Sequence, residues 1–445
     1  MKRTLLLVVA VVSFTYGQTF QELSLEDALV IGKENSKALR ISEAKVDAAS
    51  ARSSEAGTAL LPSFKLEGGY KRQSNIDPFA LSVPFLFPSP IVISPNIPNV
   101  YNLRLGLQQP LFTGFKLLSN ARAANRLADA SEADLKGNES DLVLNITTAY
   151  WMLYQAIETR KYVDDNVDRL TSYLSDTQNL MKAGMATRND LLKIQVQLSN
   201  AKLSQIDAAN DVDVAMMTLN NIMGQPLETV VHLTSVPAAT RGRGGDSSRV
   251  TTVTPTPQLV DMAMQSRPDL LAMTYRVQAA QASAKAVQGG WWPQIALTAN
   301  YFYSRPNQRF LPLQDEFKGT WEVGVAMQFD VWNWGSTLFQ TEQAQSQVRQ
   351  SEYTLAQMKD NASLEVKKYK LGVERATKRI TVAQEAIDQA EENSRSTNEK
   401  YRNGLATSTD LLDASLAVLQ ARTSYAGALV EDEIALARLK KSIGQ

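Results

Sequence analysis

Cysteine and histidine, two side chains that often serve as catalytic nucleophile, base or metal ligand, are almost absent from this sequence of 445 residues. Cysteine is missing, so we expect no disulfide framework, thiolate metal site, cysteine nucleophile or lipid-modified N-terminal cysteine. The only histidine, His232, lies in the apolar stretch "TVVHLTSVP" and is interpreted as structural or incidental. The glycine-rich "RGRGGD" lacks the Lys-Ser/Thr and the flanking strand of a phosphate-binding loop. We therefore expect no enzymatic activity, no cofactor and no metal site.

The carboxylates with the most suggestive spacing lie in an eleven-residue stretch that the chain contains twice. "KAGMATRNDLL" spans 182–192, and "RNGLATSTDLL" spans 402–412, 220 positions later. Each copy has a glycine, a threonine and an aspartate in the same register: Gly184, Thr187 and Asp190, then Gly404, Thr407 and Asp410. Glycine can adopt the left-handed conformation that ends a helix, and threonine can cap the next helix with an aspartate three residues on. Each stretch therefore predicts a tight, exposed turn between two helices.

The duplication extends over most of the chain. "GTALLPSFKLEGGY" (57–70) parallels "QGGWWPQIALTANY" (288–301), and the copies end alike, with "IMGQ" at 225 and "SIGQ" at 445. Internal repeats of this kind define an architecture. We predict two repeats, 18–234 and 259–445, joined by a linker over 235–258 that is rich in Pro, Gly, Ser and Thr.

Each repeat is predicted to contain a helix, two strands, a long helix, a turn and a final helix. In the first repeat the helices are expected at about 25–61, 115–183 and 187–223, and the strands at about 63–73 and 99–110. In the second repeat the helices are expected at about 259–291, 336–402 and 407–443, and the strands at about 294–304 and 320–330.

The four predicted strands alternate in polarity. In "QIALTANYFYS", apolar residues at 295, 297, 299, 301 and 303 share one face, and the other face carries Gln294, Thr298 and Asn300. Such segments with aromatic ends are typical of a transmembrane β-barrel, although a soluble sheet packed on helices would alternate in the same way. Known single-chain membrane barrels begin at about 8 strands. Membrane-spanning strands would therefore have to be pooled by several chains.

Apolar residues recur at spacings of four and three along both long helices. In the second repeat they are Val366, Tyr369, Val373, Ala376, Ile380, Ala383, Ile387 and Ala390. In the first repeat they are Leu142, Ile146, Ala149, Leu153, Ala156, Val163, Val167 and Leu170, interrupted at Arg160. A sustained 3.5-residue repeat predicts a coiled coil. A helix of some 65 residues is a rod of about 100 Å at ~1.5 Å per residue, a length suited to crossing a compartment.

The N-terminus predicts export. Residues 1–17, "MKRTLLLVVAVVSFTYG", have the charged start, apolar run and small-residue end of a cleavable signal peptide, and the run is too short for a membrane span. No later stretch approaches the ~20 apolar residues of a spanning helix. Lys+Arg and Asp+Glu balance at 46 each, so no binding of nucleic acid is expected.

The signal peptide, duplicated strand pairs, paired coiled-coil hairpins and two turns together resemble the TolC-like outer membrane efflux protein family. "LEDALVIGKENSKALR", its counterpart "SRPDLLA" and "QQPLFTG" belong to the same resemblance, which covers essentially the whole mature chain. It implies a mainly α fold with a β-barrel part. Three chains, each giving four strands, would form a 12-stranded barrel in outer-membrane lipid, continuous with a periplasmic coiled-coil α-barrel. Such a homotrimer would be a passive, gated exit duct of a tripartite efflux or type I secretion system, with a periplasmic adaptor and an inner-membrane transporter as partners.

The same resemblance implies functional roles at the two turns. Adaptor-contacting hairpin tips would be Gly184, Met185, Ala186, Thr187, Gly404, Leu405, Ala406 and Thr407. A periplasmic gate would contain Tyr401 with its acidic partner Asp190, and a cation-favouring ring of Asp410 and Asp413, which share a helical face at i, i+3. The family's arginine two residues after the second turn glycine is Ala406 here, so that salt link is missing. The gate is then expected to rest on other contacts or to open more readily.

Two loops and one alternative complete the prediction. The proline-rich loop 76–99 is expected at the outer surface, where it constricts the mouth, lies against the outer leaflet or packs irregularly, whereas the loop "SRPNQRFLPLQDEFKG" is interpreted as polar and ordinary. The alternative function is a soluble periplasmic coiled-coil scaffold or adaptor, which would not depend on detergent. The substrate class, whether drug, metal or protein, stays open at this point.

Overall fold

The computed structural model describes residues 21–81, 85, 88, 91–240 and 255–445. The predicted signal peptide and positions 241–254 of the predicted linker lie outside the described residues. The chain divides into two compact units: unit 1 comprises Met1–Ile41, Lys136–Arg267 and Asp360–Gln445, and unit 2 comprises Ser42–Leu135 and Pro268–Lys359. Each unit contains residues from both repeats, so the compact units do not coincide with the repeats seen in the sequence.

The order of elements follows the predicted unit twice, with additions. In the first repeat they are β1 (Gln21–Leu23), α1 (Leu25–Asn35), α2 (Lys37–Thr58), β2 (Ser63–Arg72), β3 (Phe79–Leu81), β4 (Ile91–Ser94), β5 (Asn99–Phe112), α3 (Lys116–Lys182), α4 (Arg188–Met223) and β6 (Val231–Leu233). In the second they are α6 (Thr256–Ser266), α7 (Pro268–Gln288), β7 (Gln294–Arg305), β8 (Lys318–Gln328), α8 (Ser336–Arg402) and α9 (Ser408–Ser442), with a short 3₁₀ turn at Gly289–Trp291. Another 3₁₀ turn, Ala238–Thr240, lies in the predicted linker. Among the described residues, no helix is both long and apolar enough to cross a bilayer.

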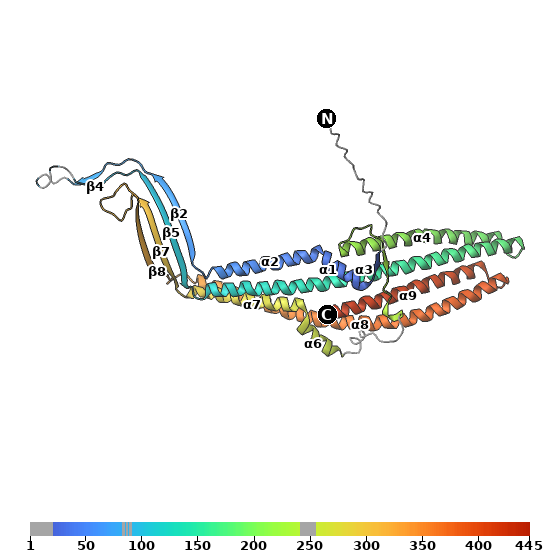
Figure 1. The fold of residues 1–445 in the computed structure, drawn as a ribbon. Helices are drawn as coiled ribbons and strands as arrows, with labels where there is room; N and C mark the ends of the chain where they lie inside the picture. Colours follow the sequence, from blue (N-terminus) through green and yellow to red (C-terminus); the bar gives the residue numbers. More distant parts are fainter. Residues whose placement is uncertain (1–20, 82–84, 86–87, 89–90, 241–254) are drawn as a thin grey trace, which may run out of the picture. The chain divides into compact units, whose positions relative to one another are not determined.

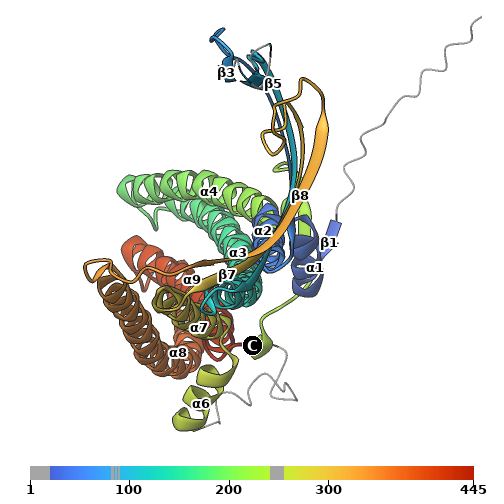
Figure 2. The same cartoon turned by 90° about the vertical axis from the view of Figure 1, so that its left-hand side faces the viewer.

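Unit 2 contains a four-stranded antiparallel sheet in the order β2-β5-β7-β8, seen as long strands running side by side in Figures 1 and 2. The central pair, β5 and β7, joins the two repeats and places Leu105 opposite Tyr301. The four strands are 10, 14, 12 and 11 residues long, and a tilted transmembrane strand needs ~9–11. Within the described residues, β2 and β8 are each paired on one side only, so both edges of this sheet are open.

The two faces of the sheet differ in the way that the sequence predicts. One face is apolar and exposed, with Leu66 on β2 and Val325 on β8 among its residues. An aromatic group including Tyr101, Tyr303 and Phe317 lies at one end of it, and four exposed tryptophans lie at the other. Those tryptophans are Trp291, Trp292, Trp332 and Trp334. An apolar band between two aromatic bands is the surface of a strand set that faces lipid.

Close packing at the junction of strands and helices explains two of the sequence glycines. Gly114 has φ +61°, a conformation that glycine adopts easily. A Cβ there would lie 2.5 Å from the carbonyl oxygen of Gly289. The glycine of "QQPLFTG" and the first glycine of "QGGWW" are therefore required by contact between the two repeats.

Unit 1 contains two helical hairpins, α3/α4 and α8/α9, which run next to each other in Figure 1. Near the turns the four helices share one buried cluster: Val167, Leu170, Tyr173, Ile194, Leu198, Ala201, Tyr401 and Leu411. The predicted apolar seam is mostly buried on α3, whereas on α8 it is only half-buried from Ile380 to Ala390. Much of the α8 seam is therefore available to a further partner.

The first helix of each repeat is interrupted, contrary to the prediction of single helices over 25–61 and 259–291. Ser36 is extended, with ψ 112°, and its hydroxyl accepts a hydrogen bond from the amide of Leu39 at 3.2 Å, which caps α2. In the second repeat, Arg267 is extended because the following Pro268 disfavours a helical conformation before it. Pro268 then opens α7, a position that proline favours.

Candidate functional site at the hairpin tips

The two repeated stretches end their helices in the same way. Gly184 has φ +77° and Gly404 has φ +72°. The next amide, that of Met185 or Leu405, donates a hydrogen bond at 2.8 Å to the carbonyl five residues earlier in both turns. This pattern is the Schellman end of a helix, which requires a left-handed residue.

The next helices start in the same way too. The hydroxyls of Thr187 and Thr407 each accept from the amide three residues later at 3.2 Å. The carboxylates of Asp190 and Asp410 in return accept from the threonine amides, at 3.0 and 2.8 Å. The predicted capping therefore occurs at both turns, and it also places a negative charge at the positive end of each helix.

Each tip presents an apolar side chain to solvent. Met185 is 57% exposed and Leu405 is 77% exposed. Ala186 and Ala406, the next residues, are half-buried. A protruding apolar side chain on a rigid turn can be buried only by another molecule, so both tips are suited to protein contact.

A buried hydrogen bond links the two hairpins just above the tips. The hydroxyls of Tyr401 on α8 and Thr177 on α3 lie 2.8 Å apart, and both residues are buried. This differs from the expectation that Tyr401 pairs with Asp190, because Thr177 occupies the partner position. Burial raises the pKa of Tyr401, and the charges of Asp190 and Asp176 raise it further against the effect of the Thr177 hydrogen bond.

Asp190 instead bonds to the second tip. Its Oδ1 accepts from the hydroxyl of buried Ser408 at 2.7 Å, while its Oδ2 serves the helix cap. The hydrogen bonds from Thr187 and Ser408 lower the pKa of Asp190. Beside it, Lys193 Nζ donates to Thr409 Oγ1 at 3.1 Å. The starts of α4 and α9 are thus tied together.

An ion pair between α8 and α3 also links the two hairpins in this region. Arg402 Nη2 lies 2.8 Å from Asp176 Oδ2, which also accepts from Arg402 Nε at 3.1 Å. Ala406, where the resemblance implies an arginine, packs against the buried cluster instead. The four inter-hairpin links are called the tip clasp here: Thr177–Tyr401, Asp176–Arg402, Asp190–Ser408 and Lys193–Thr409.

Further polar links lie farther from the turns than the clasp does, and they were not predicted from the sequence. Ser415 donates to Asn166 Oδ1 at 3.1 Å, and both residues are buried. Arg422 lies 2.6 Å from Glu391 and 3.1 Å from Asp165. The only signal for such contacts in the sequence is the polar residue Asn166, which stands next to the apolar seam position Val167.

Asp410 and Asp413 lie outside the clasp. Both are exposed, on one side of the first turns of α9. Hydrogen bonds from the hydroxyl and the amide of Thr407 lower the pKa of Asp410. Within the described residues, no group of three or more Asp, Glu or His side chains is placed to hold a metal ion.

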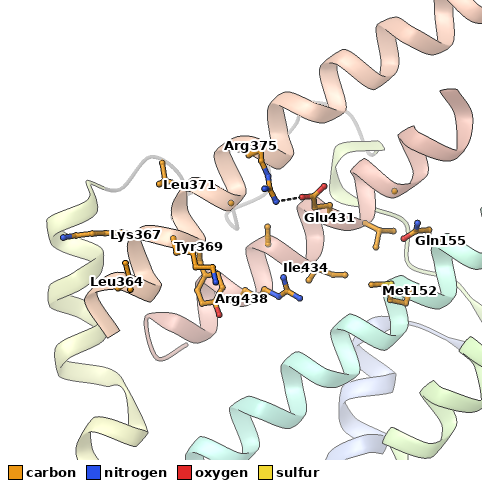
Figure 3. A pocket seen from close by; sticks show the side chains of 15 residues that line it. Met152, Gln155, Leu364, Lys367, Tyr369, Leu371, Arg375, Glu431, Ile434 and Arg438 are labelled. Atoms are coloured by element: carbon orange, nitrogen blue, oxygen red, sulfur yellow. Dashed lines mark hydrogen bonds and ion pairs between the residues drawn. The ribbon is translucent and has the colours of Figure 1, made fainter. Parts of the chain in front are cut away.

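An apolar groove lies on the α8/α9 side of unit 1, shown in Figure 3. Its volume is about 690 Å³, and its lining includes Leu364, Leu371 and Ile434. The Arg375–Glu431 ion pair, 2.7 Å between Nη2 and Oε1, lies at its rim. A second hollow continues along the same helices past Val382.

Comparison with known sequences identifies the family to which the chain belongs. The sequence model described as outer membrane efflux protein matches residues 31–225 and 259–445. The alkaline protease secretion protein AprF of Pseudomonas aeruginosa is 23% identical over 348 residues, which cover 76% of this chain and 69% of that protein. Outer membrane protein TolC of Vibrio cholerae is 21% identical over 447 residues, which cover 100% of this chain and 96% of that protein.

Comparison with solved structures gives the same fold. The outer-membrane channel OprN has a TM-score of 0.77 at 19% identity, covering 94% of this chain and 89% of that one. The outer membrane protein VceC of Vibrio cholerae has a TM-score of 0.79 at 16% identity, covering 94% and 96%. The strand set and helical hairpins of this chain therefore have the same fold as these outer-membrane proteins.

Proposed function

The chain belongs to the outer membrane efflux protein family and is an outer-membrane exit duct, and we propose that three copies form one duct with a gate at the hairpin tips. The duct conducts substrates passively from an inner-membrane transporter and a periplasmic adaptor to the exterior. Residues 1–17 direct export and are removed. The tip clasp is the single observation that carries the gate, because it joins the two hairpins that would have to separate.

Open sheet edges support the assembly. Unpaired strand edges in lipid cost several kcal/mol for each unsatisfied backbone group. Pairing β8 of one copy with β2 of the next would remove both edges in every copy. A head-to-tail contact of this kind closes into a ring, and four strands from each of three chains make a barrel of ordinary size.

A ridge on α4 supports the same contact between helices. It consists of exposed apolar side chains at heptad-like spacing: Leu192, Val196, Leu203, Ile206, Val214 and Met217. The groove of the α8/α9 side is hollow and apolar, so the ridge of one copy fits the groove of the next. Exposed Asp207 and Asp211 lie about as far along α4 from its turn as basic Lys378 and Arg379 lie along α8 from theirs. Opposite charges therefore meet in this arrangement.

The strength of the clasp suits a gate. The buried Thr177–Tyr401 bond is worth about 1 kcal/mol. The half-exposed Arg402–Asp176 pair adds at most about 1 kcal/mol after solvent screening. A few kcal/mol per copy keeps the hairpins together at rest. A partner with differential affinity on the order of 5 kcal/mol could open them.

The tips and the exposed carboxylates have the remaining roles. The tip residues 184–187 and 404–407 contact the adaptor through Met185 and Leu405. Asp410 and Asp413 of three copies ring the aperture and favour cations. Relatives include a protease secretion protein and the cobalt-zinc-cadmium resistance protein CzcC of Cupriavidus metallidurans. The transporter recruited by the adaptor, rather than the duct, then selects the cargo.

The decisive experiment is purification of the full chain from outer membranes after crosslinking in cells. We expect a detergent-dependent trimer that carries a periplasmic adaptor and a transporter. Asp410→Asn with Asp413→Asn should lower the cation selectivity of the purified channel in planar bilayers. A detergent-free monomer in the periplasm would support the scaffold alternative and overturn the channel.

A further inference from the structure

The loop between β7 and β8 is fixed to the polar face of the sheet, although its sequence looks ordinary. Asn307 is buried, and its amide group donates to the carbonyl of Lys318 at 2.9 Å and to Thr320 Oγ1 at 3.3 Å. Its own Oδ1 accepts from the amide of Arg309 at 3.0 Å. Thr320 precedes Trp321, which belongs to the apolar face of β8, and successive residues of a strand point to opposite faces. Asn307 is therefore attached to the polar face.

Arg309 makes the second attachment on that face. Its guanidinium forms an ion pair with Glu322 and donates to the carbonyl of Trp321 at 3.3 Å. The same guanidinium lies 5.5 Å from the ring centroid of Phe302, which is the single aromatic residue on the polar face of β7. The loop therefore folds back over the sheet rather than continuing outward from it.

Arg309 is the last member of a chain of side chains that crosses all four strands. Arg104 contacts Glu67 at 3.4 Å and donates to Asn300 at 3.0 Å, and Asn300 donates to Glu322 at 3.1 Å. Arg104 also lies 5.7 Å from the Phe302 centroid, so two guanidinium groups lie close to this ring. This set is called the outer ladder: Glu67, Arg104, Asn300, Glu322 and Arg309. Its charged members are half-exposed, as in a wall that faces water.

The other end of the loop is held on the apolar face. Arg305 bonds to both carboxylate oxygens of Asp315, at 2.8 and 3.1 Å. Phe317 stacks on Tyr303 with ring centroids 5.1 Å apart. The loop thus straddles the end of the sheet. Leu311, which is 83% exposed, lies on the segment between the two attachments.

We propose that this loop is a fixed constriction of the outer mouth of the duct and that the outer ladder holds it there. The proposal rests on the proposed assembly, because the polar face lines a pore only when three sheets close with their apolar faces toward lipid. The three copies of residues 307–311 then project toward the axis. Two restrictions in series follow, one at the hairpin tips and one at the outer mouth, and the second excludes solutes by size.

Spin labels can test the position of the loop, because the chain has no cysteine and an introduced one is unique. Leu311→Cys and Val323→Cys trimers are labelled separately, and the distances between the three copies are measured by double electron–electron resonance. We expect shorter distances at 311, on the pore side, than at 323, which is exposed on the apolar, lipid-facing side of β8. Adding Arg309→Gln and Glu322→Gln should shift the 311 distances to longer values and broaden them.

Arg305→Gln is the matched control, since it releases only the end of the loop at Asp315 and leaves the attachments of Asn307 and Arg309 to the polar face in place, so the 311 distances should stay unchanged. Labels at 311 that lie as far apart as those at 323 would overturn the constriction. Distances at 311 that do not respond to loss of the Arg309–Glu322 pair would overturn the role of the ladder. A failed assembly is distinct, because it gives no dipolar coupling at either site and a monomer mass by light scattering.

Discussion

At the scale of residues, the clasp depends on a few hydroxyl groups rather than on strong charges. Thr177 and Tyr401 are hidden from solvent, so their bond has no competition from water. Asp190 serves two partners, one in its own helix cap and one on the opposite hairpin. Where the resemblance implies an arginine at 406, the ion pair between the hairpins runs instead from Arg402 to Asp176.

Replacement of the buried hydroxyls should loosen the gate. Thr177→Val with Tyr401→Phe removes about 1 kcal/mol of hydrogen bonding per copy while keeping the shape of the cluster. We expect longer open times and higher mean conductance in planar bilayers. Thr171→Val is the control, because the hydroxyl of Thr171 bonds only within its own helix, to the Val167 carbonyl at 2.8 Å. Equal conductance in the double variant and the Thr171 control would show that the hydroxyl pair does not hold the gate closed.

The Asp190 link should resist mild acid. Its hydrogen bonds lower the pKa of Asp190 in the folded clasp. The stability it contributes is therefore fully present above the unfolded value of about 3.9 and is lost only as the pH falls through the lower folded value. We expect the same closed-state conductance at about pH 7 and about pH 5. Opening within that interval would show that another titrating group controls the gate.

At the scale of elements, each tip is a rigid turn built from backbone bonds and one capping box. The glycine ends the first helix, and the threonine begins the second within four residues. Because the turn is so short, the apolar tip residue is kept in a fixed position. The second turn lies against the first, since Met185 Cε is 3.9 Å from the position of a Cβ on Gly404.

Gly404→Ala should destabilise the tip through its backbone alone. The added methyl meets only the flexible end of Met185, but φ +72° is unfavourable for alanine by about 1 kcal/mol. Gly57→Ala is the opposite control, because Gly57 lies inside α2 with open space around it. That change should stabilise by about 0.5–1 kcal/mol. Thermal melting of the trimers should thus move in opposite directions, and a fall in both would contradict the assignment.

At the scale of the whole molecule, one chain has surfaces that it cannot satisfy alone. The exposed apolar face of unit 2, the open edges of its sheet, the α4 ridge and the α8/α9 groove all require other partners. Lipid suits the first. A second copy of the chain suits the other three, because each incomplete surface has its complement elsewhere in the same sequence.

A charge placed in the ridge should prevent assembly. Ile206→Asp introduces a carboxylate where the next copy would bury apolar surface, at a cost of several kcal/mol per contact. We expect monomers in detergent, measured by light scattering, with the helix content retained. Val30→Asp, at an apolar residue of α1 that is 56% exposed against 66% for Ile206, is the control and should remain trimeric. Trimers from the Ile206 variant would place the helical contact on a different face.

The sequence determined the features that depend on neighbours along the chain. Alternating polarity indicated the strands, the 3.5-residue repeat indicated the long helices, and the Gly, Thr and Asp of each tip indicated the turns, because these signals act over a few residues. Repetition of the pattern showed the resemblance to the family. The same local reasoning overlooked the breaks at Ser36 and Arg267, where a serine cap and a following proline end a helix early.

Only the tertiary structure decided which distant side chains meet. Thr177 replaces Asp190 as the partner of Tyr401, Arg402 pairs with Asp176, and Arg309 turns a loop of ordinary composition onto the polar face. The partners in each pair are separated by 13 to 226 positions in the chain. Their choice depends on a few ångströms of helix offset and strand register, which packing sets and which composition and periodicity do not encode.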